Sequence, residues 1–149
     1  MDVYLIPISK RAKMDVTQIP FAKYIGIEKK EEGILKLEPT DIVQNHIQTI
    51  HASAQFALAE TQSGLYLQDL FPTYVGKVLP LLRSASVKFK HPAQCSITAE
   101  ANVPDIEKEK FLALFEKKGR ASILVTVELI DEKGVVTMTG EYHWFIQKI

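Results

Sequence analysis

The stretch ASAQFALAETQSGLYLQDL, residues 52–70, decides the fold of this 149-residue chain. It is rich in alanine, and Phe56, Ala59, Ser63 and Leu67 form one stripe when it is drawn as a helix. Further apolar residues lie elsewhere around the circumference. A helix that is apolar on most sides has to be wrapped by other structure. We therefore predict one long, buried helix over residues 52–70.

Glu60 is the only charged side chain between Asp41 and Asp69 when histidine is counted as neutral, and it lies inside this apolar helix. An unpaired carboxylate in apolar surroundings costs several kcal/mol, or its pKa rises. Perturbed carboxylates are common at functional sites, so we predict a chemical or ligand-contacting role for Glu60. A structural carboxylate, paired across a dimer, is the alternative.

A polar loop, NHIQTI at residues 45–50, leads into this helix. Asn45 is either a turn or capping residue or a member of a site. His51 should lie at the start of the helix, where it would hydrogen-bond the loop or a substrate. His46 and Thr49 are typical of loop packing and capping.

Composition and charge indicate a single soluble globular domain. The chain is 46% hydrophobic and 24% charged, and its 18 basic and 18 acidic residues cancel. Without a basic face to displace counterions, we expect no nucleic-acid partner and no anionic membrane surface.

One cysteine, Cys95, allows no disulfide within the chain, and a cytoplasmic location is the natural expectation. The apolar run at residues 3–8 is interrupted by Pro7 and preceded by Asp2, which is a poor layout for a signal peptide. No stretch approaches the roughly 20 apolar residues of a membrane-spanning helix.

The rest of the sequence predicts mostly strands. Residues 23–29 and 33–37 read as a hairpin, residues 86–90 and 97–103 alternate, and residues 122–130 and 135–146 form the clearest hairpin. Residues 105–118 predict a second, amphipathic helix with Asp105 as its N-cap and Gly119 at its end. We expect an α+β domain, in which a curved antiparallel sheet wraps the helix at residues 52–70.

The spacing of three polar residues carries a family resemblance. Asn45 is followed six residues later by His51 and nine residues after that by Glu60, and the segment SVKFKHPA at residues 86–93 ends a basic, aromatic strand in Pro-Ala. This pattern resembles the hotdog-fold thioesterases related to the phenylacetyl-CoA thioesterase family, and is nearest to their uncharacterised thioesterase-like domains. The resemblance covers residues 20–149 and implies a single hotdog domain, with an extra short helix between strands and residues 1–20 as an N-terminal extension.

The resemblance implies hydrolysis of an acyl thioester, without a metal and with coenzyme A only as part of the substrate. A helix N-terminus offers unpaired N–H groups and a positive dipole end to a developing oxyanion, and the backbone N–H of Ala52 would serve here. Glu60 would act as a general base or as a nucleophile. Asn45 and His51 would complete the catalytic group.

Helix geometry adds a requirement. Ala52 and Glu60 are eight residues apart, hence about 12 Å apart along one helix. This is too far for both to contact the carbonyl group of one substrate. Antiparallel helices from two subunits would bring Glu60 of one chain to Ala52 of the other, as hotdog dimers do. We therefore expect a homodimer with two equivalent sites, or a tetramer built from such dimers.

The substrate, an acyl-CoA or an acyl-carrier protein, needs further contacts. Thr49, Ser53, Phe56 and Ser63 are candidates near the thioester. Basic residues beside the expected tunnel are candidates for binding the CoA phosphates: Lys88, Lys90, Arg83 and Arg120. Four apolar residues could form the walls of an acyl site or simply belong to the core: Phe56, Leu67, Phe71 and Tyr74.

Two departures from the family pattern keep another function class open. Ala52-Ser53 stands where the family often has Gly-Gly, and Gln48 stands where a glycine often precedes Thr49. The Cβ atoms of these residues leave less room for a substrate to approach the backbone than glycine does. A non-catalytic module that binds an acyl thioester or assists assembly is therefore the alternative to a thioesterase, and a dehydratase of the same fold is a weaker third.

Overall fold

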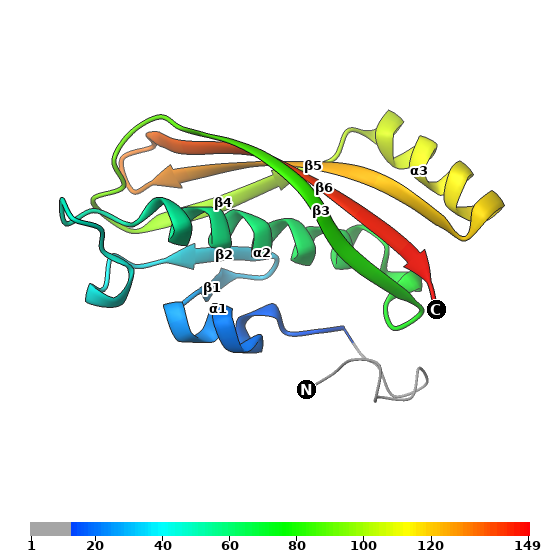
Figure 1. Ribbon diagram of the computed structural model, residues 1–149, viewed down its shortest axis with the longest axis horizontal. Coiled ribbons are helices and arrows are strands. Elements are labelled where there is room, and N and C mark those ends of the chain that lie inside the picture. The colour runs from blue at the N-terminus through cyan, green and yellow to red at the C-terminus, as the bar shows by residue number, and fades with distance from the viewer. Residues whose placement is uncertain (1–12) are drawn as a thin grey trace.

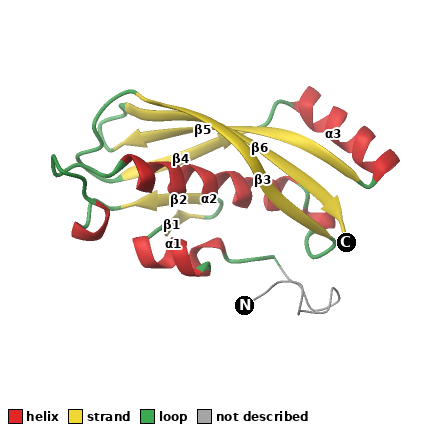
Figure 2. Cartoon of the chain, in the orientation of Figure 1, coloured by secondary structure: helices red, strands yellow, loops and turns green. Residues whose placement is uncertain are grey.

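A computed structural model describes residues 13–149 of the chain, in which one strongly curved sheet wraps a long helix (Figures 1 and 2). The helices are α1 (Pro20–Ile25), α2 (Ala52–Leu70) and α3 (Asp105–Lys118), with the short 3-10 helices η3 (Val16–Gln18), η4 (Asp41–Val43) and η5 (Pro72–Tyr74). The strands are β1 (Glu28–Glu31), β2 (Ile34–Leu37), β3 (Val78–Phe89), β4 (Ile97–Asn102), β5 (Arg120–Asp131) and β6 (Val136–Lys148).

The six strands form one antiparallel sheet in the order β1-β2-β4-β5-β6-β3. The long pairs lie at one side, where β6 runs between β5 and β3 over most of its length. α3 follows β4 and packs at the end of α2, with the Phe111 ring 5.0 Å from the Phe71 ring and the Phe115 ring 4.8 Å from the Tyr74 ring. The sheet is thus closed at one end by aromatic packing.

The buried helix expected over residues 52–70 is confirmed with the same bounds. Leu58, Ala59 and Ser63 on α2 have no solvent exposure. The last strand alternates over part of its length, because Met138, Gly140, Tyr142 and Ile146 of β6 are buried while Glu141 and His143 are exposed; Thr137, next to Met138, is also buried. Complete burial of a side chain such as Leu58 stabilises the fold by about 1.5–3 kcal/mol.

The first hairpin was predicted too early in the chain. Residues 20–25 form α1, not the strand expected over residues 23–29, and β1 begins only at Glu28. Pro20 lies at the first helical position and Gly26 ends the helix with φ 87°. A proline that starts a helix and a glycine that ends it are a helix signature, which here outweighs the apparent alternation.

Two smaller predictions also change. The strand expected at residues 86–90 is the last part of a 12-residue strand, β3, which begins at Val78. Pro104, not Asp105, is the N-cap of α3, and Asp105 lies in the first turn without a side-chain cap bond. Its charge there still favours the helix through the dipole. Gly119 ends α3 in the left-handed conformation with φ 70°, as predicted.

The sheet wrapped around α2 confirms the expected hotdog architecture. The apolar run at residues 3–8 lies outside the described residues. None of the helices formed by residues 13–149 is long and apolar enough to cross a membrane.

Candidate active site

Asn45 organises the loop that leads into α2. Its Oδ1 accepts hydrogen bonds from the backbone N–H groups of Ile47 and Thr49, both at 3.0 Å, and its Nδ2 donates to the Thr49 hydroxyl at 2.8 Å. Thr49 is buried. The side chains of both predicted site residues are therefore engaged in holding the loop shape.

The loop turns at Gln48, whose φ is 63°. This left-handed conformation is the one that glycine adopts without strain, and a Cβ makes it less favourable. The hydrogen bond from the Gln48 N–H to the Asn45 carbonyl, at 3.1 Å, closes the turn. Gln48 therefore adopts a backbone conformation that favours glycine, although it carries a side chain.

His51 caps α2 through its ring. Its Nδ1 accepts a hydrogen bond from the Ser53 N–H at 2.9 Å, and its carbonyl accepts from the N–H groups of Ala54 and Gln55. Nδ1 carries no proton in this arrangement. Three N–H groups of the first turn are therefore satisfied by one residue.

The Ala52 N–H is the one left over. It finds no acceptor among residues 13–149, although it is the first N–H of a 19-residue helix. A free N–H at the positive end of a helix dipole is suited to an anion or a polarised carbonyl. The backbone group that the sequence singled out is therefore available.

Glu60 lies two turns further along α2 and is half-buried. Burial raises the pKa of its carboxyl above the usual range. Its carboxylate has no ion pair or hydrogen bond to any described residue. A carboxylate that is partly desolvated and unpaired is more basic than an exposed one, as a general base should be.

Two aromatic residues of β6 pack against α2, one a turn before Glu60 and the other a turn after it. The Tyr142 ring packs against Phe56, one turn before Glu60, with ring centroids 5.3 Å apart. The Trp144 ring covers Gly64, one turn after Glu60, and its Nε1 donates to the Ser63 hydroxyl at 2.8 Å. Of the two, Tyr142 is close enough to Glu60 for the carboxylate charge to raise the pKa of its hydroxyl.

A cavity of about 320 Å³ begins beside Gly64 and runs along the C-terminal half of α2. Of the expected acyl walls, Leu67, Phe71 and Tyr74 line it and Phe56 does not. Ser63, a predicted substrate contact, is buried, and its hydroxyl donates to the Glu60 carbonyl at 2.6 Å. Ser53 is exposed at the first turn of α2.

The basic candidates lie at different ends of the long strands. Lys88 and Lys90 are exposed at the end of β3, from which the chain continues to Ala93, whose carbonyl accepts from the Ile50 N–H beside α2. Arg83, in the middle of β3, lies 3.9 Å over the Phe145 ring, and Arg120 begins β5 at the other end. Only the two lysines share the end of the molecule that holds the Ala52 N–H.

Several functional candidates escaped sequence reasoning. Tyr142 and Trp144 lie two residues apart on one face of β6, but their packing on α2 beside Glu60 depends on how β6 crosses α2. Gln68 lines the cavity, and its role depends on a contact with Met14, 54 residues away. Within residues 13–149, no three His, Cys, Asp or Glu side chains gather as a metal site.

Solved structures match this fold over most of the chain. A probable thioesterase of unknown function from Pseudomonas aeruginosa, PA5026, has a TM-score of 0.75 and 19% identity, covering 97% of each chain. BH2602 from Bacillus halodurans, solved with CoA, has a TM-score of 0.65 and 16% identity over 85% of this chain and 74% of its own. Thioesterase HI1161 from Haemophilus influenzae has a TM-score of 0.70 and 13% identity over 89% and 86%. No curated protein matches the chain.

The sheet, the central helix and these neighbours define a hotdog-fold protein, and PA5026 and HI1161 are the neighbours described as a probable thioesterase and a thioesterase. Within that class the chain belongs to the family described as a domain of unknown function (DUF4442), whose model matches residues 26–146.

Proposed function

We propose that this protein hydrolyses an acyl thioester, carried by CoA or by an acyl-carrier protein, at a site shared between two subunits. The observation that carries the proposal is the pairing of complementary groups on one helix: a free N–H at Ala52 and a half-buried, unpaired carboxylate at Glu60. The first stabilises a developing oxyanion, and the second activates water or attacks the carbonyl. Neither group needs a metal.

The distance between these groups argues for two subunits. Eight residues of helix separate them by about 12 Å, so Ala52 of one subunit would act with Glu60 of the other. His51 and Asn45 act as positioning residues in this scheme, because His51 caps α2 and Asn45 holds the loop before it. Lys88 and Lys90 lie at the α2 end where CoA phosphates would approach.

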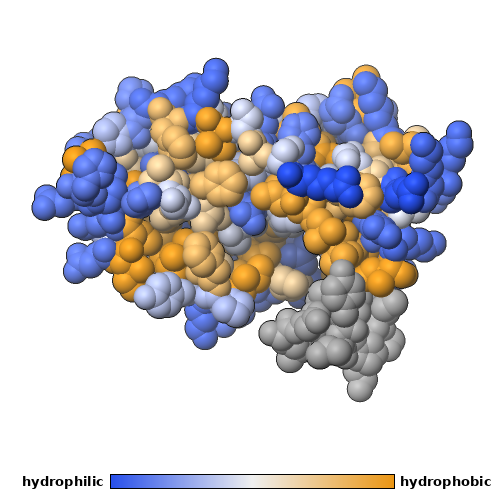
Figure 3. Space-filling view, viewed as in Figure 1, coloured by the Kyte–Doolittle hydropathy of each residue, from blue (hydrophilic) through white to orange (hydrophobic). Residues whose placement is uncertain are grey.

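The edges of the sheet favour β3 as the dimer contact. β1, at one edge, is four charged residues, EKKE, and such an edge resists pairing. β3, at the other edge, is 12 residues long and exposes Leu81 and Phe89, and β6 is its one partner among the strands of residues 13–149. Hydrophobic residues gather across the middle of the face on which β3 crosses α2 (Figure 3). Two β3 strands could pair about a two-fold axis.

The experiment measures thiol release from acyl-CoA thioesters of short, medium, long and aromatic acyl groups. Wild-type protein is compared with Glu60→Gln and Ala52→Pro at equal folded concentration. Proline is well suited to the first helical position and removes only the N–H. His51 already has φ −58° and ψ 141°, the conformation required before proline. Both variants should fold and lose turnover.

Mixing the two inactive variants tests the shared site. A heterodimer carries one site with an intact Ala52 N–H and an intact Glu60, so random mixing should restore roughly a quarter of the wild-type sites. No recovery, from a mixture shown to exchange subunits, would contradict a shared site. Tight binding of thioesters without turnover by the wild type would favour the binding-module alternative, which the Cβ atoms of Ala52 and Ser53 at the helix start make plausible.

A further inference from the structure

We infer that the cavity at the C-terminal half of α2 holds the hydrocarbon end of a medium-length aliphatic or arylalkyl acyl group, and that residues 14–19 limit the length of that group. We call residues 14–19 the strap. The assignment of the ligand as an acyl group rests on the proposed function, but the apolar character of the cavity and the role of the strap do not.

Among residues 13–149, the cavity has no side-chain group left to recognise a polar ligand. Three of its lining side chains carry polar groups, and each is engaged inside the protein. Gln68 binds the backbone of Met14, Trp144 donates to Ser63, and the Tyr74 hydroxyl donates to Glu116. The lining that residues 13–149 provide contains no charged residue and is otherwise built of aliphatic and aromatic side chains, a proline and two glycines. The group that fills it must therefore be apolar.

The cavity comes within one helical turn of the proposed reacting carboxylate. Gly64 lines it and is one turn of α2, about 6 Å, beyond Glu60. A Cβ on Gly64 would lie 3.6 Å from the Trp144 ring, which is ordinary contact, so packing does not require a glycine here. Glycine inside a helix costs about 1 kcal/mol relative to alanine. Its effect at residue 64 is to leave space between α2 and Trp144.

The size of the cavity selects among apolar groups. A cavity of about 150 Å³ is enough to bind benzene in another protein. At about 320 Å³, this one has room for a chain of medium length or a ring on a short linker. An acetyl group would leave most of the cavity empty, and a long-chain acyl group would exceed it unless the strap moved.

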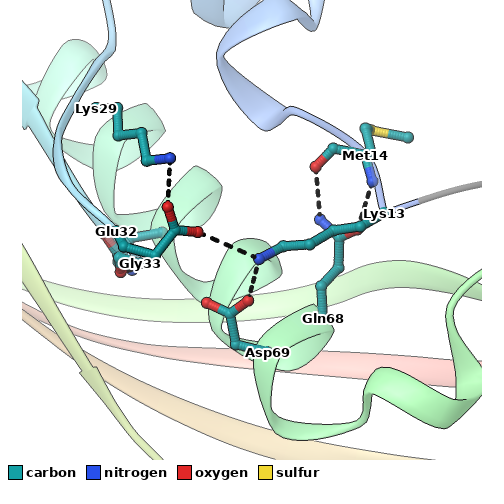
Figure 4. Close-up of polar contacts among 8 residues, drawn as sticks. Lys13, Met14, Lys29, Glu32, Gly33, Gln68 and Asp69 are labelled. Atoms are coloured by element: carbon teal, nitrogen blue, oxygen red, sulfur yellow. Dashed lines mark hydrogen bonds and ion pairs between the residues drawn. The ribbon is translucent and has the colours of Figure 1, made fainter.

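Residues of the strap line the cavity. Polar contacts of Met14 and of the preceding Lys13 hold the start of the strap to α2 (Figure 4). Gln68 accepts from the Met14 N–H at 2.8 Å and donates to the Met14 carbonyl at 3.1 Å. Lys13, next to it, pairs with Asp69 and lies 4.0 Å from Glu32. Val16 is buried and lines the cavity together with Met14 and Ile19. These residues precede the part of the chain that the family model matches, residues 26–146.

Trp144 provides a direct measure of occupancy, since it is the only tryptophan of the chain and lines the cavity. We would titrate the protein with 1-octanol, 2-phenylethanol and ethanol and follow its fluorescence. Saturable changes with the first two and none with ethanol are expected. No saturable change with either would overturn the inference. Because these alcohols contain no thioester and no CoA, the result is independent of turnover.

Filling the space beside Trp144 tests whether the alcohols bind in this cavity. Gly64→Leu should weaken octanol binding at least about tenfold, or 1.4 kcal/mol, while Ala113→Leu, an exposed position of α3, should leave it unchanged. Circular dichroism checks that each variant is folded. Gly64→Ala adds only a methyl group and favours the helix, so it should give a smaller loss even if the leucine variant fails to fold. Unchanged octanol binding by both Gly64 variants would overturn the assignment.

Releasing the strap tests the length limit. Gln68→Leu removes both hydrogen bonds to Met14 but keeps an apolar wall, and Asp69→Asn weakens the Lys13 pair without touching the cavity. Both should shift the preferred alcohol from octanol toward dodecanol, the former by several fold. The same shift should appear in the acyl-CoA panel if the protein is a thioesterase. An unchanged preference in both variants would show that the strap sets no limit.

Discussion

The hydroxyl of Tyr142 on β6 donates a hydrogen bond to the carbonyl oxygen of Phe56 on α2, and the two oxygens are 3.0 Å apart. Tyr142 has no solvent exposure. Burial, and secondarily the charge of Glu60, raises the pKa of the Tyr142 hydroxyl far above its ordinary value, so the hydroxyl stays a donor. This contact fixes the β6 strand to α2 one turn before Glu60.

Replacing Tyr142 with phenylalanine should therefore reduce stability with little change in packing. One net hydrogen bond is worth about 1 kcal/mol, and the free energy of unfolding from urea titration should fall by about that amount. Tyr24, which is 72% exposed, gives the matched control, since Tyr24→Phe should be neutral. Equal effects at both positions would mean that the Tyr142 bond adds no stability.

His51 is predicted to act by positioning, and asparagine separates this role from chemistry. Asparagine is a favourable N-cap whose side chain can accept the Ser53 N–H, whereas alanine cannot, at a cost of about 1 kcal/mol. His51→Asn should retain stability and a substantial part of thioesterase turnover, and His51→Ala should lose both. If turnover disappears in the asparagine variant at full stability, His51 touches the reacting atoms.

The loop residue Gln48 should be better replaced by glycine. A φ of 63° costs a residue with a Cβ about 1–2 kcal/mol. Glycine removes this cost, but it also raises the entropy of the unfolded chain, which cancels part of the stabilisation. Gln48→Gly is expected to raise the free energy of unfolding by about 0.5–1 kcal/mol. Gln44, with φ −77°, is the control, because the same change there should destabilise. A loss of stability at Gln48 would contradict the strain assigned to it.

Sequence patterns predicted those parts of the fold that follow from local periodicity. The bounds of α2 follow from an apolar pattern that is not typical of a surface helix, and the buried face of β6 follows from the alternation of residues 138–143. The strand predicted over residues 23–29 failed because a six-residue helix between Pro20 and Gly26 has too few residues to display a helical period. The extent of β3 was missed because most of its side chains are exposed and lack a buried face.

The sequence predicted the site residues that lie on one helix. It did not predict the parts of the site that depend on tertiary contacts. Glu60 was visible as a lone charge in an apolar run. The availability of the Ala52 N–H depends on which neighbours His51 caps, and this is a matter of side-chain geometry. Gln68 reads as an ordinary polar residue near the end of a helix, and only the fold brings Met14 within reach of it.

The raised pKa of Glu60 predicts how stability should depend on pH. The unfolded chain releases this proton near the ordinary value of 4.5, and the folded protein releases it only at higher pH. As pH rises through that interval the folded state holds more protons, so the free energy of unfolding falls. Glu60→Gln keeps the shape of the protonated carboxyl group but does not titrate in this pH range. It should be more stable than wild type at neutral pH, and the advantage should fade below pH 4.5. Urea titrations between about pH 4 and pH 8 measure both curves, with exposed Glu141→Gln as the control. A constant difference across this range would mean that burial does not perturb the Glu60 carboxylate.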